Sequence, residues 1–122
     1  MIYIASPYTS DNPGILNFRA AEVMRYCAWV FSEHGLNPYS PIAHWHGICK
    51  AHILPTDAAT WANCNRDTLR RCDAMHVLQL PGWQESVGVA MELEWAEVMG
   101  LPVTYARVDR HGFCLTRPAV VA

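Results

Sequence analysis

A chain of 122 residues is long enough for one domain with its own hydrophobic core and too short for two. Its formal net charge of −2 offers no basic surface to a nucleic-acid polymer, and no apolar run reaches the roughly 18 residues of a membrane span, so we expect neither as a partner. With 52% hydrophobic and only 16% charged residues, the chain predicts a globule whose surplus apolar surface enters a homodimer or higher homo-oligomer.

The first half of the chain predicts two strands and one long helix. The apolar segment IYIAS (2–6), closed by a Ser-Pro pair, predicts a buried strand and a turn. An apolar stripe from Ile15 to His34 predicts a helix, which ends at Gly35. The segment LNPYSPI (36–42) predicts a brief strand, and the histidine-rich stretch from Ala43 to Pro55 is expected to be irregular.

The second half alternates helices and strands. A helix is expected from Asp57 to Cys72, followed by a strand over AMHVLQL (74–80). A second helix then runs to a stop at Gly100. The segment PVTYARV (102–108) predicts another strand, which turns at DRHG into a short final one.

This alternation predicts an α/β fold in a single domain over residues 1–122. We expect a doubly wound, flavodoxin- or Rossmann-like parallel sheet of about five strands with helices on both faces. In such sheets the ligand binds beyond the carboxyl ends of the strands. Residues 6–9, 39–46 and 81–88, which follow the first three strands, are therefore expected to share one functional rim.

Glu92 is the most unusual residue of the last helix, SVGVAMELEWAEVM (86–99). At about 100° per residue, Glu92 shares its face with small and apolar residues such as Val89 and Ala96, whereas Glu94 and Glu97 lie on the opposite side. Ser86 is positioned to cap the helix, and Gly88 allows close approach to its first turn. Glu92 is therefore expected to be buried near the anion-attracting end of this helix.

Two roles are open for such a carboxylate. In the structural one, Glu92 is paired with a cation, for which the candidates are Arg19, Arg25 and Arg66. In the functional one, it is held dry beside a ligand pocket and acts as a nucleophile or base. The start of its helix at the expected rim favours the functional role.

The cysteines indicate the compartment. The chain has five, scattered and without a CxxC pair, and its first residues lack the basic region of a signal peptide. We therefore expect reduced, mostly buried thiols in a cytoplasmic protein.

Three segments together resemble a known group of enzymes. They are YIASPY (3–8), GLNPYSPIAHWH (35–46) and CDAMHVLQLPGWQESVGVAMELEWAEVMGLPV (72–103). They resemble the nucleoside 2-deoxyribosyltransferase-like superfamily over roughly residues 2–105, most of all a small phage and bacterial branch with an LPGW..S.G...E signature, related to 2′-deoxynucleoside 5′-phosphate N-hydrolases.

The resemblance implies cleavage or transfer of the N-glycosidic bond of a nucleoside or its 5′-monophosphate, without a cofactor. Glu92 matches the nucleophile, which attacks C1′, expels the base and forms a covalent glycosyl-enzyme that water or a second base resolves. Tyr3 matches a tyrosine that orients this carboxylate. Without the resemblance, Tyr3 is a strand aromatic packed in the core.

The residues expected around the substrate follow from the same resemblance. Ser86 matches a phosphate-binding serine of the monophosphate hydrolases, although it also suits a helix N-cap, and Gly88 belongs to the same end of the site. Asn65 stands where relatives carry an aspartate that contacts the sugar or base, and Asp67 is the alternative for that role. The residues after the first strand contain no arginine, so Ser6, Tyr8 and Thr9 are the binding candidates there.

The histidine-rich segment HWHGICKAH (44–52) permits two interpretations. Its His and Cys residues form a set that can ligate zinc, but the spacing matches no known finger, and we expect no metal site. We expect instead that His44 or His46 lines the base pocket, with Trp45 or Trp83 stacking on the base. The tryptophans suit the core or a dimer interface equally well.

Two functions of other classes remain open. A non-catalytic nucleotide-sensing module predicts tight binding without turnover and little loss of affinity in Glu92→Ala. A zinc-stabilised interaction protein predicts stoichiometric metal and unfolding by chelators.

Overall fold

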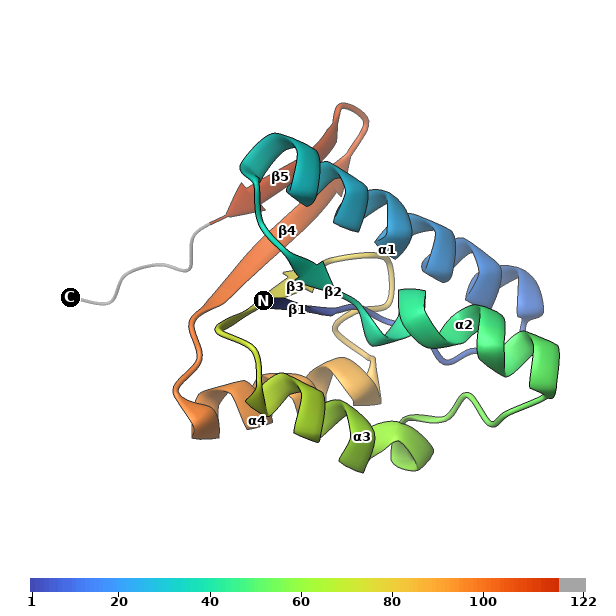
Figure 1. Ribbon diagram of the computed structural model, residues 1–122. Helices are drawn as coiled ribbons and strands as arrows, with labels where there is room; N and C mark the ends of the chain where they lie inside the picture. Colours follow the sequence, from blue (N-terminus) through green and yellow to red (C-terminus); the bar gives the residue numbers. More distant parts are fainter. Residues whose placement is uncertain (117–122) are drawn as a thin grey trace.

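The computed structural model describes residues 1–116, and the end of the predicted domain, 117–122, lies outside the described residues. These residues form five strands and four helices (Figure 1). In chain order they are β1 (Ile2–Ala5), α1 (Pro13–His34), β2 (Pro38–Tyr39), α2 (Pro41–His52), α3 (Ala58–Arg70), β3 (Ala74–Leu78), α4 (Val87–Met99), β4 (Val103–Asp109) and β5 (Gly112–Thr116).

The strands form one mixed sheet in the order β2-β1-β3-β4-β5. The pairs β1–β2, β1–β3 and β3–β4 are parallel, whereas β4–β5 is antiparallel. The expectation of a wholly parallel sheet is therefore wrong at this edge. A parallel pair needs a long crossover, but only Arg110 and His111 separate β4 from β5, so the chain turns back on itself.

The helices cover both faces of the sheet. In Figure 1, α1 and α2 lie on one side of it and α3 and α4 on the other. Alternate residues of each strand point to opposite faces, so Tyr3 of β1 packs with residues of α3 and α4, whereas Ile4 packs with residues of α1. The predicted α/β architecture with helices on both faces is confirmed at this level.

The segment expected to be irregular is a helix. Residues Pro41–His52 form α2, with Pro41 in its first turn and the Ser40 hydroxyl accepting a hydrogen bond from the Ala43 amide (3.0 Å). The sequence signal was weak because the helix contains a glycine and ends at Ile53, which adopts a left-handed φ of 55° where glycine is the usual residue. The histidines of this segment therefore project from a helix.

The other predicted elements are found within a few residues of their expected bounds. Gly35 and Gly100 end α1 and α4 in the left-handed conformation, and Ser86 caps α4. All five cysteines are free thiols, but the expectation that they are mostly buried is wrong, because only Cys49 and Cys72 are buried.

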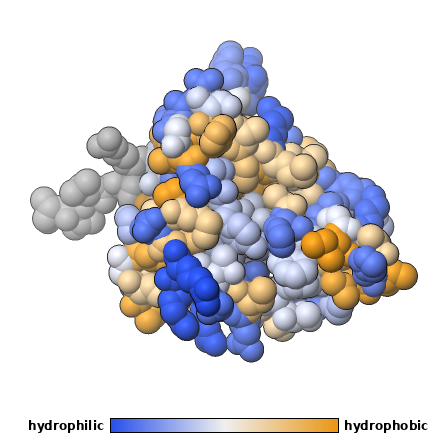
Figure 2. All heavy atoms as spheres, viewed as in Figure 1, coloured by the Kyte–Doolittle hydropathy of each residue, from blue (hydrophilic) through white to orange (hydrophobic). Residues whose placement is uncertain are grey.

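Several large apolar side chains remain at the surface. They include Phe18, Met24 and Phe31 on α1, Val87 and Val98 on α4, and Ile53 after α2. Figure 2 shows apolar surface interleaved with polar surface on the face that it presents, with one apolar region at the right, where α2 meets the chain leading to α3. The homo-oligomer stays a prediction. Over residues 1–116, no helix combines the length and hydrophobicity needed to cross a membrane.

Candidate functional site

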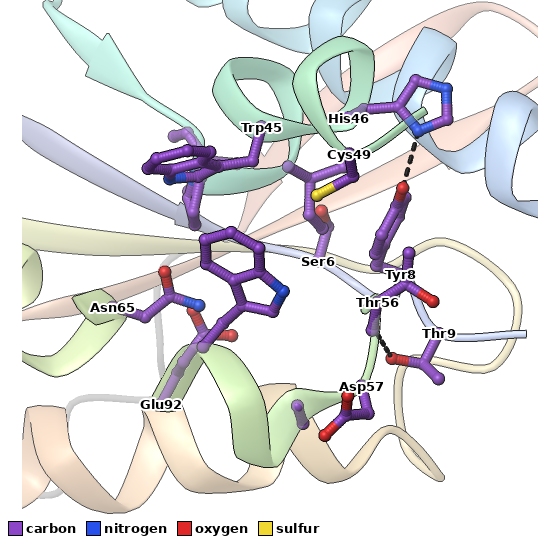
Figure 3. A pocket seen from close by; sticks show the side chains of 15 residues that line it. Ser6, Tyr8, Thr9, Trp45, His46, Cys49, Thr56, Asp57, Asn65 and Glu92 are labelled. Atoms are coloured by element: carbon purple, nitrogen blue, oxygen red, sulfur yellow. Dashed lines mark hydrogen bonds between the residues drawn. The ribbon is translucent and has the colours of Figure 1, made fainter. Parts of the chain in front are cut away.

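One pocket opens beyond the carboxyl ends of β1 and β2, where ligands of such sheets are expected. It encloses about 550 Å³, part of it open to solvent. The end of β1 and the loop after it, α2, the start of α3 and one residue of α4 supply the lining. Its polar and aromatic members are Ser6, Tyr8, Thr9, Trp45, His46, Cys49, Thr56, Asp57, Trp61, Asn65 and Glu92 (Figure 3).

Glu92 is the one residue of α4 that lines this pocket. Its side chain is 6% exposed, and the neighbours on its helix face, Val89 and Ala96, are fully or almost fully buried. The helical arithmetic for this face is therefore confirmed. In Figure 3 the Glu92 carboxylate points from α4 toward the pocket, near the side chain of Asn65.

None of the three arginines proposed as partners pairs with Glu92. Arg19 donates hydrogen bonds to the backbone carbonyls of Tyr8 and Thr9 (3.2 and 3.0 Å). The other two interact within their own helices, Arg25 with Glu22 and Arg66 with Asn63. Within residues 1–116 no ion pair involves Glu92, so the structural role as an ion-pair member is not supported.

The environment of Glu92 favours its neutral form. Burial raises the pKa of this carboxyl from 4.5 to about 8, and the neighbouring Tyr3 hydroxyl opposes the rise. The same burial, and then the charge of Glu92, raise the pKa of Tyr3. Tyr3 and Glu92 are therefore neighbours, as predicted.

Two buried hydroxyl groups near this carboxyl lack a partner. Within residues 1–116, the Tyr3 hydroxyl and the Ser6 hydroxyl make no hydrogen bond of acceptable geometry, although the Tyr3 hydroxyl lies beside the Glu92 carboxyl group. Buried hydroxyls without partners are costly, by about 1–3 kcal/mol each. Ser6 lines the pocket, and a bound polar ligand can satisfy it.

Two tryptophans form the aromatic part of the lining. The rings of Trp45 on α2 and Trp61 on α3 lie 4.8 Å apart at an angle of 42°. The Trp61 indole donates a hydrogen bond to the Pro55 carbonyl (2.8 Å), which fixes its orientation. Trp45 was predicted from the sequence, but Trp61 was not. The sequence of one helix does not show which other helix it packs against.

His46 lines the pocket, and His44 does not. The Tyr8 hydroxyl lies 2.6 Å from His46 Nδ1, and His46 Nε2 lies 3.1 Å from Asn17 Oδ1. Since the amide oxygen can only accept, Nε2 carries the proton and the Tyr8 hydroxyl donates to Nδ1. Burial and nearby Lys50 lower the pKa of His46, so the ring is neutral. His44 is exposed and contacts Trp45 from outside the pocket.

Of the two candidates on α3, the structure brings Asn65 to the pocket and leaves Asp67 outside it. Asp67 is exposed and forms an ion pair with Arg71 (3.4 Å). Two residues along a helix correspond to about 200°, so the two side chains point in opposite directions.

The segment after β3 lies at the same rim as the segment after β1, because Arg19 donates hydrogen bonds to the carbonyls of Tyr8, Thr9 and Pro81, but residues 81–88 do not line this pocket. Trp83 packs against Tyr105 (ring centroids 5.9 Å apart) and lines a separate hollow. The Ser86 hydroxyl accepts a hydrogen bond from the Val89 amide (3.2 Å) and is an N-cap. A Cβ at Gly88 would lie 3.8 Å from the Ala58 side chain, an ordinary contact, so the start of α3 covers this turn.

The comparisons with known proteins provide a family and no activity. Residues 1–107 match the model of a domain of unknown function, DUF1937. The chain belongs to this family. No curated protein matches it.

The pocket of this DUF1937 protein combines an acidic lining with aromatic rings. Asp57 and Glu92 are its carboxyl groups, and within residues 1–116 no lysine or arginine lines it. No three His, Cys, Asp or Glu side chains of the same range lie close enough to hold a metal ion. The arrangement can stack a flat ring on a tryptophan, bind hydroxyl groups through Asn65 and Ser6, and present a carboxyl group to the bound molecule.

Proposed function

We propose that this DUF1937 protein cleaves or transfers the N-glycosidic bond of a nucleoside or nucleoside 5′-monophosphate through a covalent glycosyl–Glu92 intermediate. The observation that carries the proposal is Glu92 itself, a carboxyl group that is buried, unpaired among the described residues and oriented into a pocket. A buried carboxyl group without a cation is costly and is expected where it has a chemical task.

The residues around Glu92 suit this chemistry. Trp45 or Trp61 stacks on the base, and Asn65 binds the sugar hydroxyls. The carboxylate attacks C1′ as the bond to the base breaks, and it stabilises the positive charge that develops on the sugar. The Tyr3 hydroxyl lies beside the carboxyl group, and when substrate binds it donates a hydrogen bond to the carboxylate and orients it.

The nucleophile must be ionised, whereas burial keeps Glu92 largely protonated at neutral pH. Substrate binding supports ionisation in two ways. Sugar hydroxyls donate hydrogen bonds to the Glu92 carboxylate, and the Tyr3 hydroxyl donates another. Both interactions favour the charged form of Glu92.

The fold agrees with the proposal. The order β2-β1-β3-β4-β5 is the order of flavodoxin-like sheets, in which ligands bind where the connections from neighbouring strands diverge. The pocket lies at the carboxyl end of β1, beside β3: the chain leaves β1 through α1 on one face of the sheet and leaves β3 through α4 on the other.

The test is a panel of neutral ribo- and deoxyribonucleosides and their 5′-monophosphates, with free base quantified by chromatography, with and without an acceptor base. Base release from one class, lost in Glu92→Gln and kept in Glu94→Gln, supports the proposal. Glu94 is a matched control because it is an exposed glutamate of the same helix.

A non-catalytic nucleotide-binding module is the second candidate, and the raised pKa of Glu92 favours it, since a neutral carboxyl group is no nucleophile. This candidate predicts ligand binding that is detectable by tryptophan fluorescence, no base release, and little loss of affinity in Glu92→Ala.

A further inference from the structure

Among residues 1–116, no lysine or arginine lines the pocket to hold an anionic substrate. Asp57 and Glu92 line it, and the described arginines nearest to it are occupied elsewhere, Arg19 by the carbonyls of the loop after β1 and Arg66 by Asn63 and the Trp95 ring. Lys50 lines a neighbouring hollow instead. A phosphate group here would meet the Asp57 carboxylate and the Glu92 carboxyl group without a compensating charge.

At each helix N-terminus beside the pocket, a side chain of this protein already occupies one of the backbone donors. The Asp57 carboxylate accepts hydrogen bonds from the Thr60 amide (3.0 Å) and hydroxyl (2.7 Å) at the start of α3. Ser40 caps α2 in the same way (3.0 Å). These donors, which bind phosphate in many α/β proteins, are used by the chain's own side chains.

The pocket also lacks a group suited to protonate a leaving base. Asn65 is an amide and carries no transferable proton. His46 is neutral, with its one ring proton directed to Asn17. The Tyr8 hydroxyl donates to His46, and Glu92 is needed as the nucleophile. A neutral purine or pyrimidine would therefore leave as an anion, which is slow without an acid.

A nucleoside without a phosphate group avoids the first two difficulties, and a base that already carries a positive charge removes the third. We propose that the preferred substrates are nucleosides with a cationic, N-quaternised base, of the N-ribosylpyridinium or N7-alkylpurine class, bound against the Trp45–Trp61 pair with Asp57 and Glu92 as counter-charges. The two rings, whose centroids lie 4.8 Å apart, pack against each other and form one aromatic wall on which a flat cation can stack. This inference rests on the proposed glycosidic chemistry.

The reaction then needs no acid in its first step. A Glu92 oxygen forms a bond to C1′, the C1′–N bond breaks, and its electron pair neutralises the ring nitrogen, so the base leaves uncharged. Water then attacks C1′ and the glycosyl–Glu92 bond breaks. The free sugar forms, Glu92 is returned as a carboxylate, and one proton passes to solvent. The cation also favours ionised Glu92 while it is bound, because opposite charges nearby stabilise each other.

The experiment compares substrates that differ mainly in charge. Nicotinamide riboside is paired with nicotinic acid riboside, a zwitterion that keeps the cationic ring but has no net charge, and this pair tests binding of net charge. The pair of 7-methylguanosine and guanosine differs in the charge of the leaving ring itself and also tests the need for an acid. Because cationic nucleosides hydrolyse faster in buffer alone, each kcat/KM is divided by the uncatalysed rate. We expect this enhancement to be at least tenfold larger for the cationic member of each pair.

A variant tests the source of the preference. Asp57→Asn retains an N-cap residue at α3 while removing the charge. We expect it to reduce the cation preference severalfold, whereas Glu94→Gln, which removes an exposed charge outside the pocket, leaves the preference as it is.

The outcomes separate the two proposals. Equal or larger enhancement for the neutral members overturns the cation preference and leaves the glycosidic function standing. Release of base from no nucleoside, neutral or cationic, overturns both. A cation preference that Asp57→Asn leaves unchanged overturns the assignment of Asp57.

Discussion

Each face of the sheet buries a tyrosine beside a titratable side chain, but only one of the two tyrosine hydroxyls has a hydrogen-bond partner. On the α1 face, Tyr26 and His76 of β3 are joined by a hydrogen bond of 2.7 Å, and Phe113 packs edge-on against the tyrosine ring (5.1 Å). On the α4 face, the Tyr3 hydroxyl lacks a partner of acceptable geometry and Glu92 opens onto a pocket. A satisfied buried pair stabilises a fold, whereas an unsatisfied one beside a cavity indicates a site.

The largest expected difference between the pairs is in activity. Glu92→Gln removes the nucleophile and is expected to lower kcat for base release by about 10³-fold or more, a loss of about 4 kcal/mol of transition-state stabilisation. Its melting temperature is not expected to fall, because an amide lacks the charge that burial penalises. Residual base release within tenfold of wild type would contradict the role of Glu92.

The second expected difference is the pH dependence of stability. The folded protein keeps the Glu92 proton up to about pH 8, whereas the unfolded chain releases it near pH 4.5. Rising pH across this window therefore destabilises the fold, by up to about 1.4 kcal/mol per pH unit. Tyr3 is the titratable group beside Glu92. The stability advantage of Glu92→Gln should grow from about pH 5 to about pH 8 in denaturant melts, and a constant difference would contradict the raised pKa.

His76 predicts a slope of the opposite sign. Burial, and then His34, lower its pKa, so the folded state holds it neutral while the unfolded chain takes up a proton as pH falls below 6.5. Acid therefore destabilises this face of the sheet. The groups beside His76 are Tyr26 and His34, and neither is a carboxylate. The loss of folding stability at acid pH should therefore be the same in Glu92→Gln as in the wild type.

The third difference concerns the two tyrosines. Tyr26→Phe leaves His76 Nδ1 buried without its partner, so we expect a loss of about 1–3 kcal/mol in the free energy of unfolding. Base release per folded molecule should be retained, because Tyr26 does not line the pocket. A loss below about 0.5 kcal/mol would show that this hydrogen bond is not what stabilises the pair.

The smallest effect on stability is expected from Tyr3→Phe. The hydroxyl that it removes has no partner, so the free energy of unfolding should change by less than about 0.5 kcal/mol or increase. If Tyr3 orients the carboxylate, kcat should fall about tenfold, with KM little changed. Stability and activity falling together would place Tyr3 with Tyr26 as a structural residue.

The sequence predicted what depends on local periodicity. The rotation of about 100° per residue was sufficient to place Glu92 with Val89 and Ala96 on the buried face of α4, and the alternation of β1 placed Tyr3 on the same side of the sheet. Helix α2 was missed because three histidines and a glycine obscure its pattern. The resemblance to deoxyribosyltransferase-like proteins stays a prediction.

Residues that meet only in the folded chain could not be assigned from sequence. Trp61 and Asp57 belong to the pocket because the start of α3 lies against it, and Ala58 of the same segment lies between the pocket and Gly88 of α4. Ser86, Trp83 and His44 matched the expected chemistry in residue type but lie outside the pocket. Residue type and spacing therefore identified the candidate nucleophile, but not all of the residues that line the pocket around it.

The most direct test of the account is to trap the intermediate. A 2′-fluoro nucleoside slows both steps, because fluorine destabilises the positive charge that develops on the sugar, and a good leaving base restores the first step alone. Intact-mass spectrometry followed by peptide mapping is expected to show one added sugar, esterified to Glu92, and none in Glu92→Gln. Base release without an adduct, or an adduct on another residue, would contradict the glycosyl–Glu92 mechanism.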